Sequence, residues 1–219
     1  MTISADDITA GQAVYTKRTL RIYDWLVLGF SNRFVWKCPT AELLQHYNEC
    51  ISGNHLDVGV GTGYFLDRCK FPIDKPRVAL MDLNENCLTA TAERIARYQP
   101  ETHRANILDS IELEIEPFDS IAVNYVLHCL PGTMSTKAKV FQHMRQLLTN
   151  NGVLFGATIV HDGVNRGLMA RWLMNYYNTK QIFSNLDDDL EGLEDALQNH
   201  FQHVSIKTVG CVAVFSAHN

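Results

Sequence analysis

Short runs of consecutive apolar residues alternate along the chain with stretches in which apolar residues recur every three or four positions. The continuous runs predict strands buried on both faces, as in a parallel sheet. They cover residues 55–60, 77–82, 119–126 and 153–160. The stretches between them predict helices. Strand and helix in this order imply right-handed crossovers and a doubly wound α/β sheet.

Two of the predicted helices have recognisable ends. Asn84 is a suitable N-cap for the helix after the second strand, and Pro100 stops that helix. Ser135 similarly precedes the helix before the fourth predicted strand, and we expect Gly152 to provide its C-terminal break.

The pattern changes near the C-terminus to a period of two. Val204, Ile206 and Thr208 alternate with other residues, and a second apolar run follows Gly210. This pattern predicts two strands joined by a tight turn, which would give the parallel sheet an antiparallel edge.

The first fifty residues fall outside the alternation and are rich in aromatic side chains. We expect helical pieces across the carboxyl edge of the sheet, where open α/β sheets bind ligands. A second aromatic stretch, residues 166–183, is expected to form another cover. We interpret the chain as one domain, residues 1–219, with a helical cap (1–50), a core (51–160), a second cover (161–185) and a C-terminal helix and strand pair (186–219).

Composition excludes several classes of protein. The chain has 219 residues, 46% of them apolar, and can bury one sizeable core. Its net charge of −5, with scattered Lys and Arg, offers no surface for wrapping nucleic acid. The six cysteines form no CxxC pair, the N-terminus is unlike a signal peptide, and no apolar segment approaches membrane-spanning length. We expect a cytoplasmic protein with reduced cysteines and no membrane insertion; its oligomeric state is left open.

The candidate chemistry lies in the stretch LDVGVGTG. Gly59, Gly61 and Gly63 follow a predicted strand and open a helix, so a ligand can approach the main chain closely. Their GxGxG spacing differs from the GxGxxG of dinucleotide sites. Asp57, inside the strand, suits a ligand with an ammonium group, and Asp82, at the end of the next strand, can accept both hydroxyls of a ribose. An adenosine with an amino-acid tail, S-adenosylmethionine, satisfies all three features.

At these motifs the chain resembles the class I S-adenosylmethionine-dependent methyltransferases. LDVGVGTG is similar to their first motif, ALMDLN to their acid-ended second strand, FDSIAVNYVLHCLPG to their fourth-strand motif, and LLTNNGVLFGATIV to the helix and fifth strand. The resemblance implies a Rossmann-like, mostly parallel seven-stranded sheet with an antiparallel C-terminal edge strand and a helical N-terminal cap. Within the family the chain looks most like the small-molecule branch of the ubiquinone-biosynthesis type.

The resemblance also implies which residues bind the cofactor. Asp57 and the glycine turn would hold the methionine end, Asp82 the ribose, and Leu83 would pack on the adenine. The family often places an acid against the adenine amino group. Asn106 is the best match for that position, and Asp109 is the alternative register.

Asn124 and Tyr125 would end the fourth strand beneath the transferable methyl group. Methyl transfer from a sulfonium is an in-line displacement with an activated reagent, so positioning and electrostatics can supply most of the acceleration. A base is needed only when the small-molecule acceptor is protonated at neutral pH. His128 is the candidate for that role, and a packing role is the alternative.

Aromatic residues of the N-terminal segment are candidates for stacking on a planar acceptor or closing over the sulfonium. Tyr15 and Trp36 are preferred because they flank the segment and have polar neighbours. His161 follows the fifth strand and reaches the same edge. For each of these the alternative is a place in the core or in a solvated loop. Further candidates are Tyr23, Trp25, Arg33, Asp162, Tyr176 and Tyr177.

No metal is expected. The run Asp187 to Asp189 precedes an amphipathic stretch and is explained as acids at a helix N-terminus. Asn124 stands where metal-dependent catechol-type methyltransferases have an acid. NYVL lacks the prolines of the enzymes that methylate nucleobase amino groups. Two other functions stay open: a cofactor-bound cyclase or isomerase on the same fold, and a nicotinamide-dependent oxidoreductase, which the glycine spacing disfavours.

Overall fold

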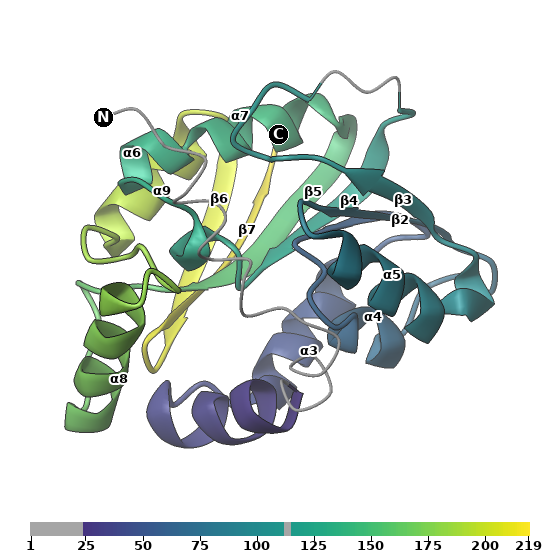
Figure 1. The fold of residues 1–219 in the computed structure, drawn as a ribbon. Coiled ribbons are helices and arrows are strands. Elements are labelled where there is room, and N and C mark those ends of the chain that lie inside the picture. The colour runs from purple at the N-terminus through teal and green to yellow at the C-terminus, as the bar shows by residue number, and fades with distance from the viewer. Residues whose placement is uncertain (1–23, 112–114) are drawn as a thin grey trace.

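In the computed structural model, residues 24–111 and 115–219 are described, and within this range seven strands form one sheet in the order β3-β2-β1-β4-β5-β7-β6 (Figure 1). Strands β1 to β5 pair in parallel, whereas β7 runs antiparallel to both β5 and β6. The predicted α/β sheet with an antiparallel C-terminal edge is therefore confirmed. The strands are β1 (Asn54–Val58), β2 (Arg77–Asp82), β3 (Glu101–Arg104), β4 (Phe118–Asn124), β5 (Leu148–Ile159), β6 (His203–Val209) and β7 (Val212–His218).

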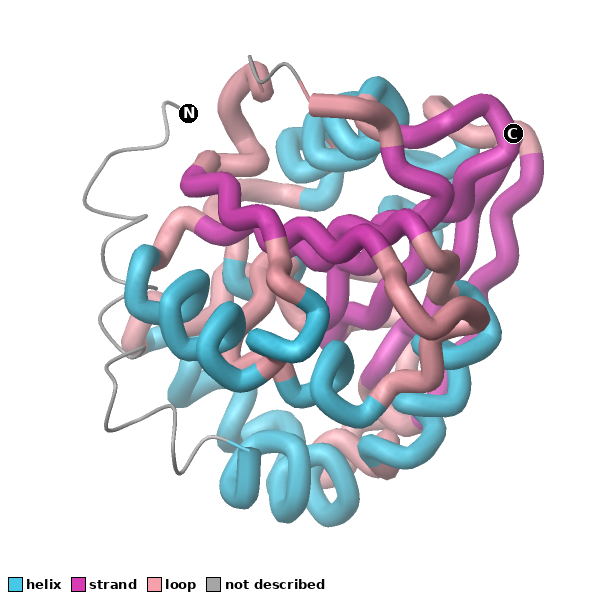
Figure 2. The backbone as a smooth tube through the Cα atoms, turned by 90° about the vertical axis from the view of Figure 1, so that its right-hand side faces the viewer, coloured by secondary structure: helices cyan, strands magenta, loops and turns pink. Residues whose placement is uncertain are grey.

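Helices cover both faces of the sheet, and Figure 2 shows the strands between them. Alternate strand residues serve the two faces, because successive side chains of a strand point in opposite directions. On β4, Ile121 and Val123 belong to one apolar cluster, and Ala122 belongs to the cluster on the other side. The covering helices are α3 (Thr40–Cys50), α4 (Tyr64–Arg68) and α5 (Glu85–Arg94) on one face, and α6 (Met134–Lys137), α7 (Lys139–Gln146) and α9 (Leu190–Gln198) on the other.

A third apolar cluster lies where the parallel strands end. It joins the π-helix η1 (Asp24–Val35) and helix α8 (Leu168–Thr179) to the ends of β5 and β7. Both stretches thus lie near the carboxyl edge, where covers are predicted. Helix α3 differs from the prediction, because much of it packs on a face of the sheet, with Tyr47 against Phe155.

The predicted start of helix α5 is confirmed. The side chain of Asn84 accepts a hydrogen bond from the backbone N of Asn86 at 3.0 Å. The helix ends at Arg94, and a 3-10 turn, η2 (Ala96–Tyr98), separates it from Pro100.

The predicted ends of the next helix are wrong. Ser135 lies inside α6, whose N-cap residue is Thr133, and α7 ends at Gln146. Gly152 belongs to β5 and is buried; a Cβ there would lie 3.0 Å from the carbonyl oxygen of Phe118. This glycine allows close approach of neighbouring strands instead of ending the helix.

No helix in the described part of the chain is long and apolar enough to cross a membrane.

The strand order places the candidate chemistry at one point of the sheet. Asp57 on β1 pairs with Leu80 of β2 on one side and with Ala122 of β4 on the other. The strand order reverses beside β1, and open α/β sheets bind ligands at such switch points.

Candidate functional site

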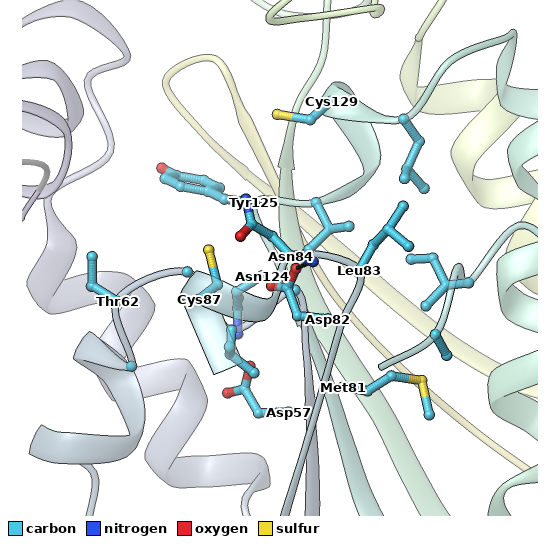
Figure 3. Close-up of a pocket in the computed structure, with 18 of the residues that line it drawn as sticks. Asp57, Thr62, Met81, Asp82, Leu83, Asn84, Cys87, Asn124, Tyr125 and Cys129 are labelled. Atoms are coloured by element: carbon cyan, nitrogen blue, oxygen red, sulfur yellow. Dashed lines mark hydrogen bonds between the residues drawn. The ribbon is translucent and has the colours of Figure 1, made fainter. Parts of the chain in front are cut away.

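A cavity opens beyond the carboxyl ends of β1, β2 and β4 (Figure 3). Its walls come mainly from the turns that follow these strands, and Leu28 of η1 closes part of it. The structure brings together at this cavity every residue predicted to bind the cofactor: Asp57, Gly59, Gly61, Gly63, Asp82, Leu83, Asn106, Asn124 and Tyr125.

The three glycines of the turn have different surroundings. All have positive φ, of 69°, 54° and 71°, a conformation that favours glycine. A Cβ on Gly59 would overlap the side chain of Val126, and one on Gly63 would lie 2.7 Å from Thr91 Cγ2. A Cβ on Gly61 would meet no described atom within 4 Å. Gly59 and Gly63 therefore allow the protein to pack, whereas Gly61 leaves space open for a ligand.

Asp57 is a nearly buried carboxylate at the floor of the cavity. Its side chain is 10% exposed. The Tyr47 hydroxyl donates a hydrogen bond to its Oδ2 atom at 2.5 Å. This carboxylate is placed to attract a cationic group.

Asp82 ends β2 on the adjacent wall. The backbone N of Asn84 donates to its Oδ1 atom at 2.8 Å. Burial raises the pKa of Asp82 to about 6, the charge of Asp57 adds to this rise, and backbone N–H donors oppose it. A buried carboxylate of this kind gains from ligand hydroxyls that donate to it.

Asn124 and Tyr125 end β4 in an unusual geometry. The Nδ2 atom of Asn124 is buried and has no hydrogen-bond partner among the described residues. Tyr125 has a φ of 58°, which is uncommon for a residue other than glycine, and its hydroxyl donates to Oδ1 of Asn32 at 3.0 Å. A buried amide donor of this kind needs an acceptor, and a ligand in the cavity can supply one.

The structure separates the two registers considered near the adenine position. Asn106 lines the cavity, whereas Asp109 is exposed and does not line it. The Asn106 side chain accepts a hydrogen bond from Leu108 N at 3.1 Å and donates to Asp109 at 2.9 Å. Its position agrees with the preferred register, but its amide already stabilises the local turn.

His128 lies in the 3-10 turn η3 (Leu127–Cys129) and is 3% exposed, behind the cavity wall. Its Nδ1 atom lies 3.3 Å from the backbone N of Ile159, which donates to it, and its ring packs edge-on against Phe183. Burial lowers the pKa of His128 to about 3, and the nearby charge of Lys137 adds to this effect. The side chain is therefore a weak base in a packed position, which favours the packing alternative.

The prediction missed two cysteines that line the cavity, Cys87 and Cys129. Burial raises the pKa of both thiols to about 12. Both remain neutral and weakly nucleophilic at physiological pH. Cys87 could have been found from the sequence, because it lies in the first turn of the helix that Asn84 caps, and that turn faces the carboxyl edge.

Trp36 and His161, two of the residues predicted to bind the acceptor, do not line the cavity. Trp36 is 1% exposed and packs on Phe183, with ring centroids 6.0 Å apart. This burial leaves Trp36 in the core and does not support its stacking on an acceptor. His161 is close to Asp162 instead, with 3.2 Å between Nδ1 and Oδ2. Tyr15 and Tyr23 lie outside the described residues.

The other aromatic and basic candidates divide between surface and core. Arg33 is exposed and stacks on Phe34, with 5.7 Å between the guanidinium carbon and the ring centroid. Tyr176 is exposed and stacks on Trp172, whereas Tyr177 packs on Phe183. The Trp25 side chain lies outside the described part of the structure.

Two of the three aspartates before α9 have different roles. Asp189 is the N-cap residue of α9 and accepts a hydrogen bond from Gly192 N at 2.6 Å, as expected of an acid at a helix N-terminus. Asp188 instead forms a fully buried ion pair with Lys137, 2.6 Å apart. Within residues 24–111 and 115–219, no group of three or more His, Cys, Asp or Glu side chains is arranged to hold a metal ion.

Comparisons with known proteins agree with this geometry. The family described as methyltransferase domain matches residues 56–154. The chain is 40% identical to demethylluteothin O-methyltransferase of Streptomyces thioluteus, over 94% of this chain and 90% of that protein. It is 35% identical to the physcion biosynthesis cluster O-methyltransferase of Aspergillus chevalieri, over 94% of each. The fold is similar to that of DhpI, solved as a complex with SAH, with a TM-score of 0.70 at 12% identity, over 99% of this chain and 98% of that one.

Proposed function

This chain belongs to the S-adenosylmethionine-dependent methyltransferases, and on that premise we propose that the cavity beyond β1, β2 and β4 binds the cofactor and that a phenolic oxygen of a small aromatic molecule is the methyl acceptor. One observation carries the proposal for the cofactor. The cavity joins the carboxylates of Asp57 and Asp82 to the open side of Gly61 and to the unpartnered amide of Asn124.

These residues fit the chemical groups of S-adenosylmethionine. Asp57 would bind the ammonium group, and Asp82 would accept hydrogen bonds from the ribose hydroxyls. Gly61 would allow the amino-acid part to approach the backbone, and Asn124 would donate to an acceptor atom of the ligand. When bound, the cofactor supplies an activated methyl group.

The protein's contribution to the displacement is mainly positioning. Apolar residues in the cavity wall, Leu28, Leu130 and Pro131, would hold a planar acceptor and exclude water from it. The neutral thiol of Cys129 would not compete for the methyl group, because its pKa is raised to about 12 by burial. His128 packs behind this wall, so we propose an acceptor acidic enough to ionise without it.

The names of two relatives support oxygen as the methylated atom, since both are called O-methyltransferases. Neither name refers to ubiquinone, so the ubiquinone-biosynthesis type stays a prediction. Because the chain belongs to the methyltransferase family, we do not propose the alternative function of a nicotinamide-dependent oxidoreductase. A cofactor-bound cyclase or isomerase would release no demethylated cofactor, and the experiment below separates it.

Turnover with labelled cofactor tests the proposal. The protein would be incubated with S-adenosylmethionine carrying a trideuterated methyl group and with a panel of phenols and matched anilines. We expect mass spectrometry to find S-adenosylhomocysteine and a trideuteromethyl ether in equal amounts, and neither with Asp82→Ala. Labelled anilines without labelled phenols would contradict the assignment to oxygen. A chemically changed acceptor without S-adenosylhomocysteine would indicate the cyclase or isomerase.

A further inference from the structure

A chain of buried polar side chains runs through the protein and ends on Asp57. The Tyr47 hydroxyl lies 2.5 Å from Asp57 Oδ2 and 2.9 Å from His55 Nε2. The other ring nitrogen of His55, Nδ1, lies 2.8 Å from Ser120 Oγ. Ser120 Oγ in turn accepts a hydrogen bond from the backbone N of Ser52 at 2.9 Å. Tyr47 comes from α3, His55 from β1 and Ser120 from β4, so this series of hydrogen bonds joins three elements behind the cavity.

The hydrogen-bond roles along this chain all point the same way. An ionised carboxylate can only accept hydrogen bonds, so the Tyr47 hydroxyl must be the donor in its hydrogen bond with Asp57. His55 must then donate from Nε2 to the Tyr47 oxygen. In the tautomer that has a single ring proton on Nε2, the Nδ1 atom of His55 accepts from the Ser120 hydroxyl. Each hydrogen bond therefore polarises the next donor in the series, and the last donor, the Tyr47 hydroxyl, contacts Asp57.

Packing fixes the middle of the chain. Tyr47, His55 and Ser120 are each 0% exposed. The Tyr47 ring stacks on Phe65 and meets Phe155 edge-on, with centroids 5.6 and 5.2 Å apart. Burial, and next the charge of Asp57, raise the pKa of Tyr47 well above its ordinary value, so its hydroxyl keeps the proton that it donates.

These three residues do not reach the cavity. Asp57 lines it, but Tyr47, His55 and Ser120 do not. Any effect that they have on a ligand must therefore pass through Asp57. The Tyr47 hydroxyl contacts the Oδ2 atom of Asp57. The Asp57 side chain is still 10% exposed, so it can also contact a ligand.

We propose that Tyr47, held in place by His55 and Ser120, is a positioning residue that orients Asp57 toward the ammonium group of the cofactor. This inference rests on the proposed function, because it takes Asp57 as the group that binds the amino-acid part. It predicts a selective effect. Loss of the Tyr47 hydroxyl weakens ligands that carry the ammonium group and leaves ligands without it unchanged.

A pair of ligands measures this selectivity. S-adenosylhomocysteine carries the amino-acid part, whereas methylthioadenosine has the same adenosine and thioether without it. For Tyr47→Phe we expect calorimetry to show about a tenfold rise in the Kd of S-adenosylhomocysteine, the low end for losing a hydrogen bond to a charged group. The Kd of methylthioadenosine is expected to stay within about twofold. The matched control is Tyr98→Phe, which removes a hydroxyl from a partly buried ring that packs on Phe71 outside the cavity.

The outcomes separate the inference from the proposed function. Equal weakening of both ligands by Tyr47→Phe would show a merely structural role, and no weakening of either would show no role; both overturn the inference alone. If wild-type protein binds neither ligand, the proposed cofactor site fails as well. If Tyr47→Phe does not fold, Ser120→Ala at the far end of the chain replaces it. That variant is expected to weaken S-adenosylhomocysteine about twofold to fivefold, with methylthioadenosine unchanged; equal or absent effects on the two ligands overturn the inference in the same way.

Discussion

Replacing Asp82 by asparagine should make the free protein more stable while weakening its cofactor site. Asparagine keeps an oxygen that can accept the hydrogen bond from Asn84 N, now 2.8 Å from Oδ1. The substitution removes only the charge. Burial raises the pKa of Asp82 from 3.8 to about 6, so the charged form is held in an unfavourable environment.

The sign and size of the effect follow from this pKa. Between about pH 4 and 6 the native protein holds a proton on Asp82 that the unfolded chain has lost, so stability falls as pH rises through this window and stays lower above it. The full rise corresponds to about 3 kcal/mol, and we expect about 1 to 3 kcal/mol. For a domain of this size, each kcal/mol shifts the Tm by about 2 to 4 °C. Asp82→Asn should therefore melt several degrees above wild type at pH 8, with a smaller gap at pH 5.

Thermal unfolding followed by circular dichroism, with and without S-adenosylhomocysteine, checks both halves of this prediction. The variant loses the charged acceptor of the ribose hydroxyls, which should weaken binding by about tenfold or more and reduce the ligand-induced rise in Tm. Wild-type protein that is more stable than the variant at pH 8 would refute the reasoning about burial. Equal stabilisation of both proteins by the ligand would refute the assignment of Asp82 to the cofactor.

Three further predictions concern the turn, the histidine and the buried ion pair. Gly61→Ala should cost about 1 kcal/mol of stability in urea unfolding because of its positive φ, and it should lose most of its affinity for S-adenosylhomocysteine. Gly59→Ala should destabilise the fold more, because its Cβ would overlap Val126. Unchanged affinity in Gly61→Ala would contradict the inference that Gly61 leaves space for the ligand. His128→Gln should keep the shape of the kcat profile between pH 5 and 9, because a side chain with a pKa of about 3 does not titrate there; disappearance of a limb would show that His128 acts as a base. Lys137→Met should cost about 3 to 5 kcal/mol in urea unfolding by leaving the Asp188 charge buried alone, and Lys137→Met with Asp188→Leu should recover much of it; a single variant within about 1 kcal/mol of wild type would be inconsistent with this pair.

The strands could be predicted where burial leaves a pattern in the sequence. Four of the parallel strands, β1, β2, β4 and β5, are continuous apolar runs covered on both faces. Strand β3 (Glu101–Arg104) was not predicted, because its residues ETHR are largely exposed and it is held mainly by backbone pairing with β2. The break between α6 and α7 also escaped prediction, since Met134 of α6 and Val140 and Met144 of α7 pack into the same apolar cluster.

The meeting of the candidate residues at one cavity could be predicted because each lies near the end of a strand or within a few positions after it, and parallel strands end at one edge. Contacts between residues far apart in the sequence could not be predicted in this way. Lys137 meets Asp188 across 51 positions of sequence, and burial decides that contact. Trp36 has an aromatic side chain that could stack on a ligand, but the packing of η1 and α8 around Phe183 places it in the core.

Isothermal titration calorimetry with S-adenosylhomocysteine tests the central claim most directly, because it asks whether the cavity binds the cofactor through Asp57. We expect one molecule bound per chain of wild-type protein, and an affinity about tenfold or more lower for a folded Asp57→Asn variant. Absence of binding to folded wild-type protein, or equal affinity in the variant, would contradict the account.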